Sequence, residues 1–217
     1  LLAFVQELYL TDENVGSEKG IIEQELKMYM DDPIFVLYDG IRNNVFEKSP
    51  FKYPIGGTIQ SIYKINRAYL TKCYNTFYNP SNMFLVITGN FDPEITLDII
   101  TKNQEGKEFK KLDGIKIKEY KEPDKVVKDY EEVSKNVDNN KFAYAIKLNL
   151  NKFNNMDEKK RNFYLSLSVE SQFDSLSEFY EKMIEKNYLT DPIEFERIIT
   201  DTHMVIVLLG ETDYPKE

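Results

Sequence analysis

The carboxylates of one segment near the start of the chain are the side chains whose placement could do chemistry. Residues 18–29 read Glu-Lys-Gly-Ile-Ile-Glu-Gln-Glu-Leu-Lys-Met-Tyr. At 3.6 residues per helical turn, Glu25 falls on the same face as Ile21 and Met28. A carboxylate on an apolar helix face loses hydration unless a proton, a cationic side chain or a metal ion compensates. Glu25 is therefore a candidate metal ligand.

Both carboxylates of this face also have structural interpretations. Glu18 lies seven residues before Glu25, in the first turn of the expected helix, where the helix dipole favours a negative charge. Glu25 could instead reach water from the edge of the apolar stripe, or pair with an arginine. On the opposite face Lys19, Glu23 and Lys27 recur four residues apart, which is typical of a solvated helix surface.

The remaining side chains do not complete a catalytic or metal site. Zinc needs further ligands, usually His, Cys or carboxylate, and the chain has one histidine, His203, and one cysteine, Cys73. We interpret His203 as a strand-end histidine with local hydrogen bonds, and Cys73 as a buried structural thiol on a helix. The same scarcity argues against a Ser-His-Asp or Cys-His catalytic group. Phosphate-binding glycine motifs do not occur.

Composition narrows the class of protein. The chain has 217 residues, 41% of them hydrophobic, which is enough for one large domain or two small ones. A net charge of −9 argues against a nucleic-acid partner. Apolar stretches are too short to cross a bilayer, so we expect no membrane partner. The single cysteine favours a reducing compartment, and we expect a cytoplasmic protein. The absence of an initiator Met suggests a segment of something longer.

Helices are expected to position the carboxylates in the first half. The expected helices span residues 1–10, 17–30, 33–46, 66–78 and 94–102, and a short turn is expected at 58–62. The first is apolar nearly all round and is predicted to be buried. Ser17, Thr58 and Asn66 are plausible N-caps. Residues 83–88, Met-Phe-Leu-Val-Ile-Thr, predict an interior strand.

The second half predicts a mixed arrangement of strands and helices. Residues 127–137 and 142–150 predict a hairpin. The other expected elements are helices starting at Asn155 or Asp157 and at Ser177, and strands at 193–199 and 204–209. This irregular order favours an α+β fold with an antiparallel sheet flanked by helices. We divide the chain into a first domain at 1–105, a charged linker at 106–125 and a second domain at 126–217.

Three motif blocks, in order, carry a resemblance to a known family. The blocks are Glu18-Lys19-x-x-x-x-x-Glu25-x-Lys27-Met28-Tyr29-x-Asp31-Asp32-Pro33, Pro54-Ile55-x-Gly57-Thr58-x-x-Ser61-Ile62 and Phe77-Tyr78-x-Pro80-x-Asn82-Met83-x-Leu85-Val86-x-x-Gly89-x-Phe91-Asp92. Together they resemble the insulinase-type M16 zinc metallopeptidases, most of all the bacterial processing-protease branch. The part after residue 125 is similar to that family in outline.

The resemblance implies a role for each carboxylate. In the family, an inverted His-x-x-Glu-His motif supplies two zinc ligands and the catalytic Glu, and a Glu on a later helix supplies the third ligand. Glu25 matches that third ligand, and Glu18 matches an acidic position that supports the site from outside the ligand set. The inverted motif is absent here, and the resemblance places it upstream of Leu1. The chain would then be the later half of one M16-type domain and the first half of a second.

We therefore expect a fragment of a zinc metalloendopeptidase that hydrolyses peptides or unfolded segments. Its catalytic residues would lie outside the chain, so the fragment alone should be inactive and bind no zinc. Peptides or proteins would be the substrates of the parent enzyme. The alternative is a non-catalytic M16-like paralogue that serves as scaffold or partner of an active peptidase. Because half-domains expose sheet edges, we also expect self-association.

Overall fold

The computed structural model describes residues 1–110, 112, 114–153 and 155–215. Residues 111 and 113 of the predicted linker, and 154, 216 and 217 of the predicted second domain, lie outside the described residues. The chain divides into two compact units, Leu1–Gln24 with Thr58–Glu119, and Glu25–Gly57 with Tyr120–Glu217. The predicted domain boundaries at 105/106 and 125/126 stay a prediction.

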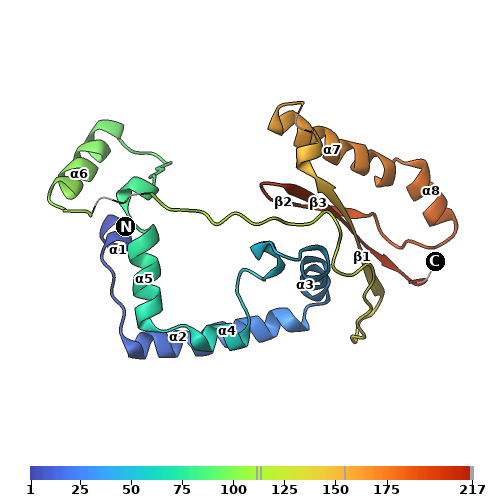
Figure 1. The fold of residues 1–217 in the computed structure, drawn as a ribbon, viewed down its shortest axis with the longest axis horizontal. Helices are drawn as coiled ribbons and strands as arrows, with labels where there is room; N and C mark the ends of the chain where they lie inside the picture. Colours follow the sequence, from blue (N-terminus) through green and yellow to red (C-terminus); the bar gives the residue numbers. More distant parts are fainter. Residues whose placement is uncertain (111, 113, 154, 216–217) are drawn as a thin grey trace. The chain divides into compact units, whose positions relative to one another are not determined.

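Helices make up the regular structure of the first unit. They are α1 (Leu2–Gln6), the N-terminal part of α2 (Asp12–Asp31), α4 (Ile59–Lys64), α5 (Arg67–Phe77) and α6 (Pro93–Glu105) (Figure 1). Thr58 caps α4, where its side chain accepts from the amide of Ser61 and the Ser61 hydroxyl completes a capping box. Asn66 caps α5 by accepting from the amide of Tyr69. Both predicted caps are confirmed.

Two predictions for the N-terminal helices are wrong. The helix expected at 1–10 is short, Leu2–Gln6; Leu1 just before it and Phe4 within it are 89% and 86% exposed rather than buried. Helix α2 begins at Asp12, because Thr11 and Asn14 cap it reciprocally through side chain and backbone. Ser17 lies inside this helix, and its hydroxyl donates to a backbone carbonyl one turn earlier.

A three-stranded antiparallel sheet forms the centre of the second unit. Its strands are β1 (Asn140–Asn149), β2 (Glu194–Ile199) and β3 (His203–Thr212), in the order β1-β3-β2. Helix α3 (Pro33–Val45) lies on one side of this sheet, and α7 (Glu158–Phe173) and α8 (Glu178–Glu185) lie on the other (Figure 1). Short 3-10 turns occur at Pro50–Lys52, Pro80–Asn82 and Leu150–Phe153. The α+β prediction with a flanked antiparallel sheet is confirmed.

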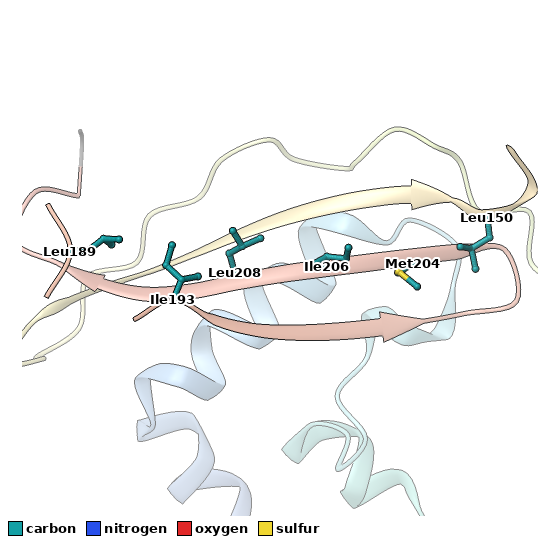
Figure 2. Close-up of a cluster of buried hydrophobic side chains, with 6 residues drawn as sticks. All are labelled: Leu150, Leu189, Ile193, Met204, Ile206 and Leu208. Atoms are coloured by element: carbon teal, nitrogen blue, oxygen red, sulfur yellow. The ribbon is translucent and has the colours of Figure 1, made fainter. Parts of the chain in front are cut away.

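The central strand β3 is buried on both faces. Met204, Ile206 and Leu208 enter the cluster under α7 and α8, which also contains Leu150, Leu189 and Ile193. Figure 2 shows these six side chains in a row along the strand. The alternate residues Val205, Val207 and Leu209 pack with Val45 and Phe46 at the end of α3. Each buried aliphatic side chain stabilises the fold by about 1.5–3 kcal/mol, so β3 is the main apolar element of this unit.

The predicted hairpin between 127–137 and 142–150 is wrong. Strand β1 pairs with β3 instead, and residues 127–137 form no strand. The amide of Val127 donates to the carbonyl of Asn44 at 2.7 Å. Because this segment bonds to the end of α3, its start is held at that helix and not at β1.

The interior strand predicted at residues 83–88 is also absent. This segment lies in no helix or strand, and Phe84 and Val86 are 91% and 69% exposed. An isolated strand has no backbone partners to stabilise it, whatever its side chains. Across the described residues, no helix is both long enough and apolar enough to span a membrane.

Candidate metal-ligand position on helix α2

Glu25 is an exposed residue of α2. Its neighbour Leu26 is buried at 6% exposure, but Ile21 and Met28 are each 62% exposed. The predicted apolar face is therefore buried at Leu26, half-buried at Ile22 and exposed at Ile21 and Met28. A buried position for Glu25 is wrong, and the structure agrees with the alternative in which Glu25 reaches water. Since Glu25 reaches solvent, its charge needs no buried partner.

The glycines of the second motif block let a loop approach this turn of α2. A Cβ placed on Gly56 would lie 3.1 Å from Cδ2 of Leu26. Gly57 adopts a φ of 73°, in the left-handed region that favours glycine. The block therefore packs against the helix one residue after Glu25.

The Glu25 carboxylate is held by Tyr29, one turn later. The Tyr29 hydroxyl donates to Oε1 of Glu25 at 2.9 Å. The ring of Tyr29 stacks on Phe35 of α3, with centroids 5.5 Å apart and an interplanar angle of 17°. This hydrogen bond to an anion raises the pKa of Tyr29, with help from the charge of Glu25. One carboxylate oxygen is thus oriented before any ligand binds.

Glu18 is exposed on the part of α2 that belongs to the first unit. Nothing in the structure tests the role that the resemblance gives it. Because α2 begins at Asp12, Glu18 lies beyond the first turn of the helix, and the expected first-turn position with its favourable helix dipole is wrong.

A zinc site needs several ligand side chains close together. No three His, Cys, Asp or Glu side chains in the described ranges gather closely enough to hold a metal ion. Glu25 is therefore a single candidate ligand, and the described residues alone do not fit a complete zinc site. No hydrolytic step can be assigned to them.

His203 is buried at 1% exposure at the start of β3. Its Nδ1 lies 2.9 Å from Oγ1 of Thr202 and its Nε2 lies 3.3 Å from Oδ1 of Asp124. The local hydrogen bond agrees with the prediction for a strand-end histidine, whereas sequence reasoning missed Asp124. Hydrogen bonds from Lys152 and Asn149, with a smaller one from His203, lower the pKa of Asp124 to about 2 against the opposing effect of burial. Cys73 is a free, half-buried thiol in α5.

Sequence reasoning also missed a buried ion pair. Nζ of Lys147 lies 2.7 Å from Oε1 of Glu122, and each side chain is 2% exposed. Lys147 shares a face of β1 with Ala143 and Ala145, which pack against the α3 side. A lysine in line with two small inward residues was the available sequence signal.

The chain has clear relatives among known proteins. Residues 64–166 match a family profile described as Peptidase M16 inactive domain. The chain is 37% identical over 197 residues to the uncharacterized zinc protease YmfH of Bacillus subtilis, covering 90% of this chain and 46% of that protein.

Solved structures agree with this relationship. A putative M16-like peptidase from Alicyclobacillus acidocaldarius has a TM-score of 0.85 and 29% identity, over 99% of this chain and 51% of that one. The ferredoxin protease FusC, solved in complex with Arabidopsis ferredoxin, has a TM-score of 0.62 and 15% identity over 96% of this chain and 23% of that one, which shows the fold alone.

The zinc protease and the solved structures each match 90% or more of the chain, and the profile and the Alicyclobacillus acidocaldarius structure both name M16 peptidases. The chain spans about half the length of the Bacillus subtilis zinc protease and about half that of the Alicyclobacillus acidocaldarius peptidase. The His-x-x-Glu-His motif does not occur in its 217 residues. By sequence and by fold, the chain belongs to the M16 peptidase family and lacks the inverted zinc motif within these residues.

Proposed function

We propose that these residues are part of a zinc-dependent metalloendopeptidase that hydrolyses peptides or unfolded protein segments, and that Glu25 supplies one of its zinc ligands. The observation that carries the proposal is the likeness to a protein named a zinc protease over 90% of the chain. The exposed carboxylate, oriented by Tyr29, supports the assignment of Glu25. The two His ligands and the catalytic Glu would come from outside these residues, so the 217-residue chain alone would be inactive.

Bound zinc would acidify a water molecule and polarise the scissile carbonyl. The contribution of this chain would be one carboxylate oxygen from Glu25. The hydroxyl of Tyr29 would fix the rotamer of that carboxylate, as outer hydrogen bonds do for other metal ligands. Glu18 would support the site without contacting the metal.

The proposal is tested on the whole protein that is encoded by the reading frame containing these residues. The measurements are its zinc stoichiometry and its cleavage of peptides. Glu25→Gln should lower zinc affinity by at least about tenfold and reduce cleavage with it. Glu13→Gln is the matched control, because Glu13 is another exposed carboxylate of α2. Unchanged metal content and activity in Glu25→Gln would exclude Glu25 as a ligand.

A non-catalytic M16-like subunit is the second candidate. The profile that matches residues 64–166 is described as an inactive domain, which favours this alternative. Such a subunit would act as scaffold or partner of an active peptidase. The sequence upstream of Leu1 decides between the two, because an intact His-x-x-Glu-His favours the enzyme and its absence favours the subunit.

Partners and location belong to the same proposal. Protein substrates are supported by the fold shared with FusC, whose structure contains a bound protein. Self-association, or pairing with an M16 paralogue, is supported by the exposed apolar segment at 83–88. We propose a cytoplasmic location on the single cysteine alone.

A further inference from the structure

The carboxylate of Glu122 is the meeting point of three segments that are distant in sequence. The amides of Glu47, Lys48 and Ser49 donate to it at 2.9, 2.7 and 2.8 Å. Nζ of Lys147 in β1 donates to it at 2.7 Å. Four donors thus converge on one carboxylate that is 2% exposed, which is a fully hydrogen-bonded arrangement for a buried charge.

Lys147 has a second attachment at the same place. Its Nζ donates to the carbonyl of Val45, the last residue of α3, at 2.8 Å. It also lies 5.5 Å from the centroid of the Phe46 ring. A cation at a helix C-terminus is favourable because the last carbonyls of the helix lack partners. Lys147 therefore holds the end of α3 directly, and also through Glu122.

The apolar packing of α3 is concentrated at the same end. Val45 and Phe46 are 4% and 1% exposed, whereas Ile34 at the other end is 38% exposed. The ion pair and the buried apolar side chains thus both act on residues 45–49. Loss of the ion pair should therefore loosen these residues first.

We propose that Glu122 and Lys147 form a latch that fixes the end of α3 and residues 47–49 onto the α3 side of the sheet. When the latch is broken, this end of α3 opens locally while the cluster under α7 and α8 stays closed. The latch is a conformational device: it makes the covering of the α3 face depend on a polar contact in addition to apolar packing, whereas the other face is held by its apolar cluster. The proposal is independent of any metal at Glu25.

Amide hydrogen exchange on the 217-residue chain tests the latch. In Glu122→Gln the amides of residues 46–49 should exchange about 10- to 100-fold faster, because Gln cannot neutralise Lys147 and its own amide group opposes the donors. Amides of β3 at 205–208, in the centre of the sheet, should change by less than about threefold. Glu119→Gln, an exposed carboxylate three residues earlier, should change neither set.

A second variant keeps the test decisive if Glu122→Gln folds poorly. The double variant Glu122→Gln with Lys147→Met removes both charges. Its amide exchange rates at residues 46–49 should be closer to those of wild type than in Glu122→Gln alone, since no unpaired charge remains buried. The latch is overturned if residues 46–49 exchange at the wild-type rate in Glu122→Gln. It is equally overturned if β3 and residues 46–49 accelerate by the same factor, because the change is then global unfolding and not local opening.

Discussion

Two apolar runs of similar composition have opposite fates in this chain. Residues 204–209 of β3, Met-Val-Ile-Val-Leu-Leu, are all 4% exposed or less. Residues 83–88, Met-Phe-Leu-Val-Ile-Thr, lie in no strand, and their five apolar side chains are 41% to 91% exposed. The first run has a strand on each side and a layer of helix on each face. The difference shows that composition decides which residues can be an inner strand, and partners decide whether they become one.

Truncation of one side chain in each run gives the largest expected contrast. Ile206→Ala should lower the free energy of unfolding by about 2–5 kcal/mol, because it leaves a cavity in a fully buried cluster. Val86→Ala should change it by less than about 0.5 kcal/mol. Urea unfolding of the 217-residue chain at low concentration measures both. Equal losses would show that residues 83–88 are buried in solution, and the comparison would fail.

Acid should weaken the sheet unit through the latch. Burial raises the pKa of Glu122, but the hydrogen bonds from Lys147 and from the amides of residues 47–49 outweigh it and hold the pKa at about 2. An unfolded-state value near 4.5 lies above this. Ionised Glu122 therefore stabilises the folded state fully above about pH 4.5, and this stabilisation is lost as the pH falls towards 2. The loss in the free energy of unfolding is about 3 kcal/mol in total.

The free energies of unfolding of wild type and of Glu122→Gln, compared between pH 5 and pH 2.5, measure this contribution of Glu122. The variant should show the shallower loss, since it lacks the titrating group. Asp124 acts in the same direction, but its side chain is 48% exposed, so solvent screens its contribution. Parallel pH profiles for the two proteins would contradict the assignment to Glu122.

Removal of the cap of helix α8 should have a smaller effect on the free energy of unfolding. Ser177 accepts from the amide of Tyr180 at the start of α8. Ser177→Ala should cost about 1 kcal/mol in thermal or urea unfolding. Ser168→Ala is the control, because Ser168 is an exposed serine within α7. A larger cost for Ser168→Ala would show that capping is not the cause.

A charge in the exposed run should leave stability unchanged and act on association alone. Val86→Lys should weaken self-association, since a lysine in this exposed apolar segment opposes its pairing with another chain. Sedimentation at high concentration measures the change, and urea unfolding should differ by less than about 0.5 kcal/mol. A wild-type chain that stays monomeric at every concentration would remove the basis for this prediction.

Local signals predicted much of the fold. Thr58, Asn66 and Ser177 cap their helices as expected, and Asp157 caps α7, because capping is decided within four residues of sequence. The strand near 204–209 follows from its apolar run, and the strand predicted at 193–199 is present as Glu194–Ile199. The two strand errors depended on distant partners: β1 pairs with β3 rather than with residues 127–137, and no strand pairs with 83–88. The predicted cap Ser17 failed for a local reason, because Thr11 and Asn14 already cap the start of α2.

The candidate site was predictable only in part. Glu25 could be selected by its spacing, but its exposure could not, because the exposure of Ile21 and Met28 beside it depends on the tertiary structure. The bond from Tyr29 was accessible to helical spacing, as the two residues are four apart. The latch of Glu122 and Lys147 joins residues up to 102 positions apart, and no local pattern encodes such a contact.

The place of β3 between β1 and β2 has a consequence for biosynthesis. It is the last strand of the described chain and the central one in the sheet, so α3 and β1 leave the ribosome long before their common partner exists. At about 5–20 residues per second, α3 waits roughly ten seconds or more for it. During that time its apolar face is open to chaperones and to other nascent chains. The order of synthesis, rather than final stability, should therefore limit the yield of folded protein.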